Sequence, residues 1–452
     1  MPEELGQLPP RMKCAPLPGP VCAEYVGRLS AAECPTMTAR TPRGAEKSGA
    51  ARDPIVWAEA RGANVLDADG NRFVDLTAGF GAAAIGHRHP RLVQAVKQQA
   101  DRLLHALGDL HPSDVKVRLL ERLAALAPFA GARAVLGLHG SDAVEIALKT
   151  AMLATGKPGV LAFEGGYHGL AYGPLAACGY SPAFREPFAA QLNPRVWFAP
   201  YPRASSRDDP GALSRAMDEV AACFKRSRGA IGAVLVEPAQ GRGGIIFPPK
   251  GFLSELGSLC KRTGALLVAD EIFTGLGRCG ALWRSFEEDM RPDLLCAGKA
   301  LGGGLPVSAC LGKPEVMAAW GDPRPEALHT ATFFGHPLGC AAALAALDII
   351  ESEGLVDSSR SRGKELAAAL RAEIGNRPEV VEIRGAGLML GIELDRGERT
   401  LALVQSLLEK GYITVPSSNG ARVLSLTPPL NISSELLSGF VPVVAECLGA
   451  LA

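Results

Sequence analysis

The chain has 452 residues, of which 47% are hydrophobic and 21% are charged, so it is long and apolar enough to bury large cores. Its 47 Lys and Arg balance 47 Asp and Glu, which argues against a nucleic-acid partner or a charged membrane surface. The sequence starts without a secretory pattern, has no apolar stretch of about 18 residues, and lacks a Cys-x-x-Cys pair among its eleven cysteines. We therefore expect a cytoplasmic protein with reduced thiols.

The N-terminal part of the chain changes character near residue 50. Residues 1–50 are rich in Pro, Ala and Cys and predict an irregular arm with one short helix near 21–30. Beyond them, apolar runs broken by turns predict a small antiparallel sheet with strands at 55–59, 64–67 and 72–76. Apolar residues spaced three and four apart then predict two helices, at 91–107 and 112–126.

Seven apolar runs follow, separated by helical stretches such as 142–155 and 252–262. Continuous apolar runs are typical of strands covered on both faces, so they predict a mainly parallel, seven-stranded sheet in an α/β fold. The runs begin at Ala134, Val160, Val196, Ile231, Ala265, Leu294 and Val307. An Ala-rich helix is expected at 339–353, before four further strands near 380–383, 389–393, 412–415 and 423–426.

These patterns divide the chain into four segments. Residues 1–50 are the arm, and residues 51–90 are the N-terminal part of a small α+β domain. Residues 91–337 form a large domain with the parallel sheet between helices, and residues 338–452 complete the small domain.

Polar residues gather where the predicted strands end, which is where open α/β sheets bind ligands. Gly140, Ser141 and Asp142 follow the first run and begin a helix. They offer backbone N–H groups and a hydroxyl to a phosphate, or else they form an ordinary helix cap. Asp270 ends the fifth run, where a carboxylate is costly to bury without a cation. That cation is either a protonated pyridine nitrogen or an arginine such as Arg278.

The sixth run leads to Lys299, which lies between small residues and precedes a glycine-rich stretch. A desolvated lysine has a lowered pKa and forms Schiff bases, although a lysine in such a loop is otherwise solvent-exposed. A phosphate cradle, a pyridinium partner and an imine-forming lysine together indicate one ligand, pyridoxal 5′-phosphate (PLP).

These residues resemble a known family, the class III (ω-type) PLP-dependent aminotransferases of fold type I. The resemblance is carried by Asp270-Glu-Ile-Phe-Thr-Gly-Leu-Gly-Arg278, Pro292-Asp293 and Gly298-Lys299-Ala-Leu-Gly-Gly-Gly-Leu-Pro306, and it extends from about Pro54 to the C-terminus. It implies a large domain with the seven-stranded sheet and a smaller α+β domain formed by the N- and C-terminal segments.

The resemblance assigns catalytic roles to two residues. It implies that Lys299 forms the imine with PLP and then moves the proton between the substrate carbon and the cofactor. Asp270 is expected to keep the pyridine nitrogen protonated, so that negative charge is delocalised into the ring.

Further matches imply residues around the cofactor. Tyr167 is expected to stack on its ring with His168 beside it, Gln240 to bond its ring oxygen, and Glu237 to line the substrate pocket. Thr332 is expected to reach the phosphate of the neighbouring subunit's cofactor, which implies a homodimer with shared active sites. Without the resemblance, these residues are surface-turn, strand-end and loop residues.

Several positions depart from the family's pattern. Leu170 and Ser425 stand where related enzymes carry arginines that hold substrate carboxylates, so both usual carboxylate clamps are missing. Arg422 is expected on the opposite face of its strand. Arg242 lies in a loop and is expected to be surface-exposed. His336 stands where Asn is common.

Without its arginine partner, Glu237 is free to face the distal ammonium of a diamine, with Phe80 and Leu170 around the methylene groups. This is a hypothesis from the sequence. His87 and His89 have metal-ligand spacing, but no third ligand is near, so they are interpreted as structural and no metal site is expected.

The resemblance therefore implies a PLP-dependent transaminase with a ping-pong mechanism. It takes an amino group from an amine, diamine or ω-amino compound and gives it to a 2-oxo acid such as 2-oxoglutarate or pyruvate. An aminomutase of the glutamate-1-semialdehyde type and an amino-acid racemase share this scaffold, and a non-catalytic binding protein on the same fold is a more distant alternative. Product analysis and the cofactor's absorbance distinguish these functions.

Overall fold

The computed structural model of the chain describes residues 5–35, 37–38, 54–204, 211–322 and 326–451. The last part of the predicted arm, and its boundary at residue 50, lie outside these residues. No helix of the described part is both long and apolar enough to cross a bilayer.

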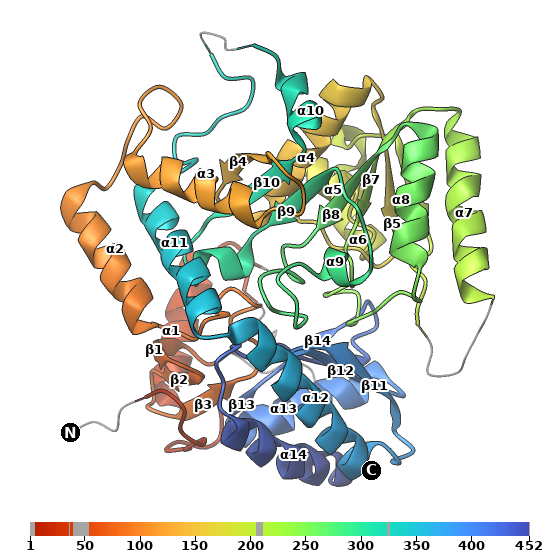
Figure 1. Ribbon diagram of the computed structural model, residues 1–452. Coiled ribbons are helices and arrows are strands. Elements are labelled where there is room, and N and C mark those ends of the chain that lie inside the picture. Colours follow the sequence, from red (N-terminus) through yellow and green to blue (C-terminus); the bar gives the residue numbers. More distant parts are fainter. Residues whose placement is uncertain (1–4, 36, 39–53, 205–210, 323–325, 452) are drawn as a thin grey trace.

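A seven-stranded sheet occupies the centre of the larger part of the molecule, in the order β4-β10-β9-β8-β7-β5-β6 (Figure 1). Its strand β10 runs antiparallel to both neighbours, and the other paired strands are parallel. The seven-stranded, mainly parallel sheet predicted from the sequence is therefore confirmed. The strands are β4 (Arg133–Gly137), β5 (Gly159–Phe163), β6 (Val196–Ala199), β7 (Ile231–Val236), β8 (Leu266–Asp270), β9 (Leu294–Ala297) and β10 (Ser308–Gly312).

Helices on both faces explain why the strands are apolar throughout. One core packs the sheet against α4 (Gly140–Thr155), and a second packs it against α7 (Ala212–Ser227) and α8 (Phe252–Thr263). Every residue of β5, β7, β9 and β10 is buried as a result. Short helices in the connections are α5 (Tyr172–Ala176), α6 (Pro182–Arg185), α9 (Arg284–Glu287) and α10 (Pro314–Met317), with 3₁₀ turns at Glu186–Gln191, Lys299–Gly302 and Ala318–Trp320.

A third group of helices packs beside the sheet, with α11 (Pro337–Ser352) against α2 (Pro90–Arg102) and α3 (Asp114–Leu126). The sequence predicted a helix to residue 107, but α2 ends at Arg102 because Leu103 is extended. The Gln99 side chain donates to the Leu103 carbonyl at 3.0 Å, which satisfies that group outside the helix.

Two smaller sheets form the lower part of Figure 1, where the first and last segments of the chain meet. The first has the order β1-β2-β3-β13 and the second the order β11-β12-β15-β14. Their strands are β1 (Trp57–Arg61), β2 (Asn64–Asp67), β3 (Arg72–Asp75), β11 (Val380–Ala386), β12 (Met389–Leu394), β13 (Tyr412–Ile413), β14 (Val415–Ser417) and β15 (Val423–Leu426). The helices of this part are α12 (Leu355–Ile374), α13 (Gly397–Glu409) and α14 (Ser434–Gly449).

The single strand predicted near 412–415 is in fact two strands that belong to different sheets. β13 pairs in parallel with β3, whereas β14 pairs antiparallel with β15. The division of the chain into domains stays a prediction, and this shared sheet supports grouping the N- and C-terminal segments.

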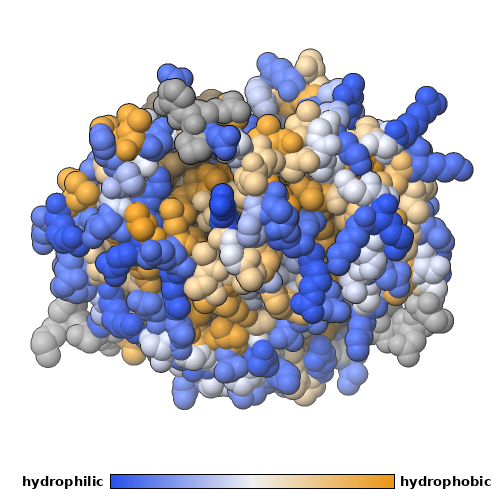
Figure 2. All heavy atoms as spheres, turned by 45° about the horizontal axis from the view of Figure 1, so that its top comes forward, coloured by the Kyte–Doolittle hydropathy of each residue, from blue (hydrophilic) through white to orange (hydrophobic). Residues whose placement is uncertain are grey.

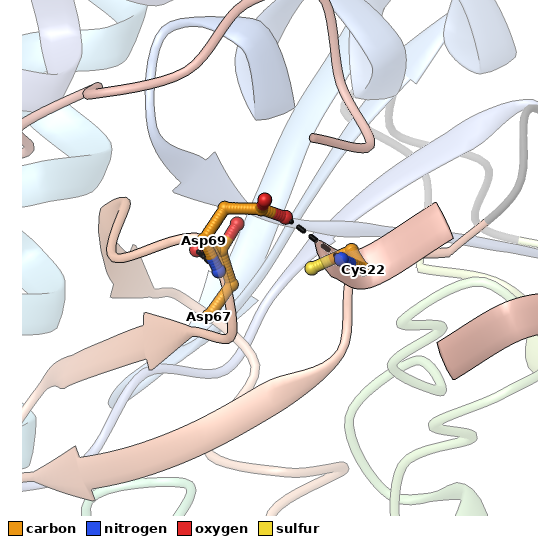
Figure 3. Close-up of side chains that lie close together, drawn as sticks. All are labelled: Cys22, Asp67 and Asp69. Atoms are coloured by element: carbon orange, nitrogen blue, oxygen red, sulfur yellow. Dashed lines mark hydrogen bonds between the residues drawn. The ribbon is translucent and has the colours of Figure 1, made fainter. Parts of the chain in front are cut away.

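The N-terminal helix α1 (Pro20–Ala32) is held by the turn between β2 and β3 (Figure 3). Asp69 accepts hydrogen bonds from the amides of Val21 and Cys22 at 2.8 and 2.9 Å and so caps a helix whose own N-cap, Gly19, has no side chain. Asp67 in turn accepts the amide of Asp69. Burial raises the pKa of the Cys22 thiol to about 11. This cluster of a thiol and two carboxylates is therefore a helix cap built from hydrogen bonds.

Candidate active site

A cavity of about 830 Å³ opens beyond the carboxyl ends of the central strands. The segments after β4, β5, β7, β8 and β9 line it, and β14 and β15 close it from the second small sheet. It therefore lies where the strand topology predicts a ligand site. The sequence-predicted residues that line it are Phe80, Gly140, Ser141, Tyr167, His168, Leu170, Glu237, Asp270 and Lys299.

A buried carboxylate of the cavity is Asp270, the last residue of β8. Its Oδ2 accepts a hydrogen bond from Nδ1 of His168 at 2.7 Å, and its Oδ1 accepts the amide of Ile272 at 3.1 Å. Burial opposes protonation of His168, but the hydrogen bond and charge of Asp270 outweigh it and raise the pKa of the imidazole. The pair thus places in the cavity a carboxylate whose negative charge is stabilised by the neighbouring His168 imidazole.

Lys299 begins the 3₁₀ turn after β9 and has a positive φ of 43°. This left-handed conformation is uncommon for a residue with a side chain and typical of functional sites. Its Nζ lies 3.6 Å from the centre of the Phe273 ring. Burial lowers the pKa of Lys299 to about 8, against the opposing effect of Asp270 and Glu237. About a tenth of this amine is therefore neutral and nucleophilic at pH 7, a few hundred times the fraction of an ordinary lysine.

The N-terminus of α4 supplies the candidate phosphate site. Gly140 and Ser141 line the cavity, and the first amides of a helix have no partner within the helix. Asp142 does not line the cavity, since its Oδ2 accepts the amides of Leu138 and His139. The structure therefore gives Asp142 the helix-capping role that was the alternative interpretation of the sequence.

Glu237 follows β7 and holds two cavity segments together. Its two carboxylate oxygens accept the amides of Tyr167 at 2.9 Å and Gly241 at 3.0 Å. Burial raises the pKa of Glu237, while the nearby His168 lowers it. The carboxylate thus fixes the backbone that carries the Tyr167 ring, besides lining the cavity itself.

Two predicted cofactor residues do not reach this cavity. The side chain of Gln240 donates to the carbonyl of Glu164 at 2.7 Å and is not among the cavity-lining residues. Through this hydrogen bond Gln240 bridges two loops, and its expected bond to a ring oxygen of the cofactor stays a prediction. Thr332 is exposed on the loop before α11, away from the cavity of its own chain. Its predicted place in a neighbouring subunit stays a prediction.

Among the cavity-lining residues that were not predicted as site residues, Phe273 and Arg242 bear most on the chemistry. Phe273 lies within the matched motif after Asp270 and faces the Lys299 amine. Arg242 was expected to be surface-exposed, and it is exposed, but it also lines the cavity above the rings of Tyr167 and Tyr180. The pocket residues Phe80 and Leu170 lie as expected at the cavity, and Phe80, with a φ of 59°, is 70% exposed.

The remaining predicted residues have structural partners. Nε2 of His87 lies 2.8 Å from Asp75, and Nε2 of His89 lies 3.1 Å from Glu353. Arg278 is buried and donates to the carbonyls of Leu388 and Pro428, so it is not the partner of Asp270.

Comparison with known proteins agrees with this geometry. The model of the aminotransferase class-III family matches residues 47–448. The chain is 37% identical over 401 residues to an acetylornithine aminotransferase of Methanopyrus kandleri, an alignment that covers 88% of this chain and 95% of the relative. It is 32% identical to a 4-aminobutyrate aminotransferase of Mycobacterium leprae, with 96% and 97% of the two chains covered.

Solved structures extend the similarity to the fold. A Toxoplasma gondii ornithine aminotransferase superposes with a TM-score of 0.80 at 28% identity, covering 95% of this chain and 94% of that one. An (S)-enantioselective ω-transaminase from Thermomicrobium roseum gives a TM-score of 0.86 at 27% identity, covering 95% and 98%.

Proposed function

Since the chain belongs to the class-III aminotransferases, which are PLP-dependent transaminases of fold type I, we propose that it transfers the amino group of a terminal amine to a 2-oxo acid. The donor is an amine, a diamine or an ω-amino compound, and the acceptor is an acid such as 2-oxoglutarate or pyruvate. The names of the relatives support this donor class, because acetylornithine, ornithine and 4-aminobutyrate all carry an amine at the end of a chain.

The chemistry of the cavity residues fits PLP. The α4 amides and the Ser141 hydroxyl suit its phosphate, the Tyr167 ring offers a flat face, and Asp270 offers an anion to its ring nitrogen. Gly169, with a φ of 110°, passes so close to Ser141 that an added Cβ would lie 2.0 Å from its Oγ, which keeps this part of the cradle open. When bound, PLP supplies an electron sink for negative charge on the substrate carbon.

We assign the reaction to three side chains. Lys299 binds the cofactor through its neutral amine and afterwards carries the proton to and from the amine-bearing carbon of the substrate. Asp270 would hold the ring nitrogen, and His168 fixes the Asp270 carboxylate through its hydrogen bond to Oδ2. The low pKa of Lys299 supports its role, because a group that both accepts and donates a proton works best near its pKa.

The observation that carries this proposal is the presence of Lys299 and Asp270 in one cavity. The test is the visible spectrum of the PLP-loaded protein during titration with 1,4-diaminobutane, 4-aminobutyrate, alanine and butylamine. We expect a terminal amine to remove the cofactor's visible band and 2-oxoglutarate or pyruvate to restore it. Lys299→Ala abolishes this cycle, and Lys410→Ala, which removes a lysine paired with Glu446 at the surface, leaves it intact. A band that persists with every donor contradicts the proposal.

We also propose that the enzyme is a homodimer with shared active sites. Exposed apolar side chains gather on the connection between α2 and α3 and on the loop before α11. Figure 2 shows that one face of the molecule has apolar patches and an apolar hollow. The two segments contact each other, with the His105 and Phe333 rings 5.4 Å apart. The apolar residues are Leu103, Leu104, Leu107, Leu110, Leu328 and Phe333. Burial of such a patch against a second copy is its simplest stabilisation.

Sedimentation analysis tests the dimer, and the double variant Leu104→Asp with Leu107→Asp is expected to be monomeric. Thr332 is tested by mixing subunits. Thr332→Ala is expected to weaken PLP binding, and hybrids with Lys299→Ala subunits should regain one intact site, because both changes then fall in the other site. Hybrids without recovery contradict the shared site.

We place the enzyme in the cytoplasm. All eleven cysteines are free thiols, and eight of them lie in the buried interior after α1, which supports a reducing compartment. Fractionation of the source cells tests this location.

A further inference from the structure

The cavity has two strong cations, Lys299 and Arg242, among the lining residues that the structure describes. Lys299 is committed to the reaction. The positions at which the sequence lacks the usual arginines, Leu170 and Ser425, both line the cavity and carry no charge. A 2-oxo acid nevertheless brings a carboxylate into this space, and a carboxylate is costly to desolvate without a cationic partner.

Three aromatic rings surround the Arg242 guanidinium and position it for a contact with a carboxylate. Its guanidinium carbon lies 4.5 Å from the centre of the Tyr167 ring, 5.0 Å from that of Tyr180 and 5.7 Å from that of Phe184. Stacking on aromatic rings uses the face of the guanidinium and leaves its N–H edge for a planar, two-oxygen acceptor. Within the described ranges Arg242 pairs with no carboxylate, and its guanidinium interacts with the neutral hydroxyl of Tyr167, so its charge is not already matched.

The backbone around Arg242 is fixed from two sides. Its carbonyl accepts the amide of Ser418 at 2.9 Å, and the hydroxyl of Tyr180 donates to the Ser418 carbonyl at 3.1 Å. On the other side, Glu237 accepts the amide of Gly241 at 3.0 Å. The loop that carries the guanidinium is therefore ordered before a ligand binds, which lowers the entropy cost of binding.

We infer that Arg242 is the residue that binds the substrate carboxylate in this enzyme, in place of the two missing arginines. The inference rests on the proposed function for its substrate, a 2-oxo acid. The contact is a bidentate pair between the guanidinium edge and the carboxylate, made beside the Tyr167 ring. Donors without a carboxylate do not make this contact. The reaction of the 2-oxo acid therefore depends on Arg242, whereas the reaction of a simple amine does not depend on this contact.

The first test measures binding without turnover. Glutarate, a dicarboxylate without a reactive carbonyl, is titrated calorimetrically into the PLP-loaded protein. Arg242→Met keeps most of the stem over the rings and removes the charge, so glutarate is expected to bind about 10- to 100-fold more weakly. Arg422→Met is the matched control, because Arg422 is exposed, donates to the Leu394 carbonyl and does not line the cavity. It should leave the glutarate affinity unchanged.

The second test uses the acceptor half of the reaction, in which the amino-loaded enzyme reacts with 2-oxoglutarate or with butanal. Arg242→Met is expected to lose about 10- to 100-fold more efficiency with the acid than with the aldehyde, while Arg242→Lys recovers part of the difference. The inference is overturned if glutarate affinity does not depend on Arg242, or if acid and aldehyde lose equally. A wild-type enzyme that accepts no amine but binds glutarate through Arg242 overturns the proposed function and not this inference.

Discussion

His168 and Asp270 are separated by 102 residues in the sequence, yet Nδ1 of the histidine lies 2.7 Å from Oδ2 of the carboxylate, and both side chains are buried. The hydrogen bond joins the loop after β5 to the end of β8. Asp270 therefore has one oxygen occupied by His168 and the other by the amide of Ile272, which fixes the plane of its carboxylate. A carboxylate fixed in this way suits a ligand whose ring has a single allowed orientation.

Replacing His168 is expected to slow transamination without removing the cofactor. His168→Gln loses a charge-assisted hydrogen bond, and we expect a fall in kcat of about tenfold or more. Asp270→Asn should cost more, because it removes the anion itself. The measurement is the rate of cofactor bleaching by the best donor. His89→Gln disturbs a histidine–carboxylate pair outside the cavity and serves as the control. Equal rates for His168→Gln and the wild type contradict the positioning role.

The lowered pKa of Lys299 predicts a pH-dependent stability of the cofactor-free protein. Between its folded pKa of about 8 and its ordinary value of 10.5, the unfolded lysine holds a proton that the folded one lacks. Stability contributed by this group therefore rises with pH through that window and is least below pH 8. Lys299→Met should be more stable than the wild type at pH 7, and the difference should shrink by pH 10. Urea unfolding at several pH values measures the difference in the free energy of unfolding between the variant and the wild type. A difference that does not change with pH contradicts the lowered pKa of Lys299.

Glu237 distinguishes two kinds of donor in the hypothesis drawn from the sequence. If its charge faces a distal ammonium, Glu237→Gln lowers kcat/KM for 1,4-diaminobutane by about tenfold more than for butylamine. The structure adds a second consequence, since the carboxylate also holds the amides of Tyr167 and Gly241. Both donors should therefore lose some activity. An equal loss for the two amines leaves Glu237 with the positioning role alone.

The loop that carries Arg242 depends on a buried arginine of the second small sheet. Arg384 donates to the carbonyls of Gly244 and Ile245 and pairs with Glu393 at 2.6 Å. Arg384→Met leaves a buried carboxylate with one fewer partner, and we expect the free energy of unfolding to fall by about 3 kcal/mol. Arg360→Met, which removes a surface pair, should change it by about 0.5 kcal/mol or less. Chemical denaturation compares the two, and similar losses contradict the prediction.

The central sheet could be predicted from the sequence because its strands are buried on both faces. Their apolar runs are continuous, as in β7 and β9, and need no tertiary information. The end of α2 could not be predicted in this way. Its apolar periodicity continues into Leu103, Leu104 and Leu107, which are exposed beyond the helix.

The site residues also fall into two groups, those that the local sequence indicates and those that only the fold places. Lys299 and Asp270 stand at strand ends, so the local sequence indicates them. Arg242 could not be placed, because the rings beneath it come from Tyr167, Tyr180 and Phe184, in segments that only the fold brings to the loop. Local sequence also did not indicate that the Gln240 side chain donates to the Glu164 carbonyl, and its predicted contact with the cofactor stays a prediction.

The pairing of β3 with β13 has a consequence for the growing chain on the ribosome. Val74 and Asp75 leave the ribosome long before their partners Tyr412 and Ile413, which follow 338 residues later in the chain (412 − 74). Until then β3 is an open strand edge, and open edges recruit other chains. A product terminated before Tyr412 keeps that edge permanently. Synthesis of Tyr412 and Ile413 thus removes an aggregation-prone surface, and chains that stop before them remain distinguishable from those that reach them.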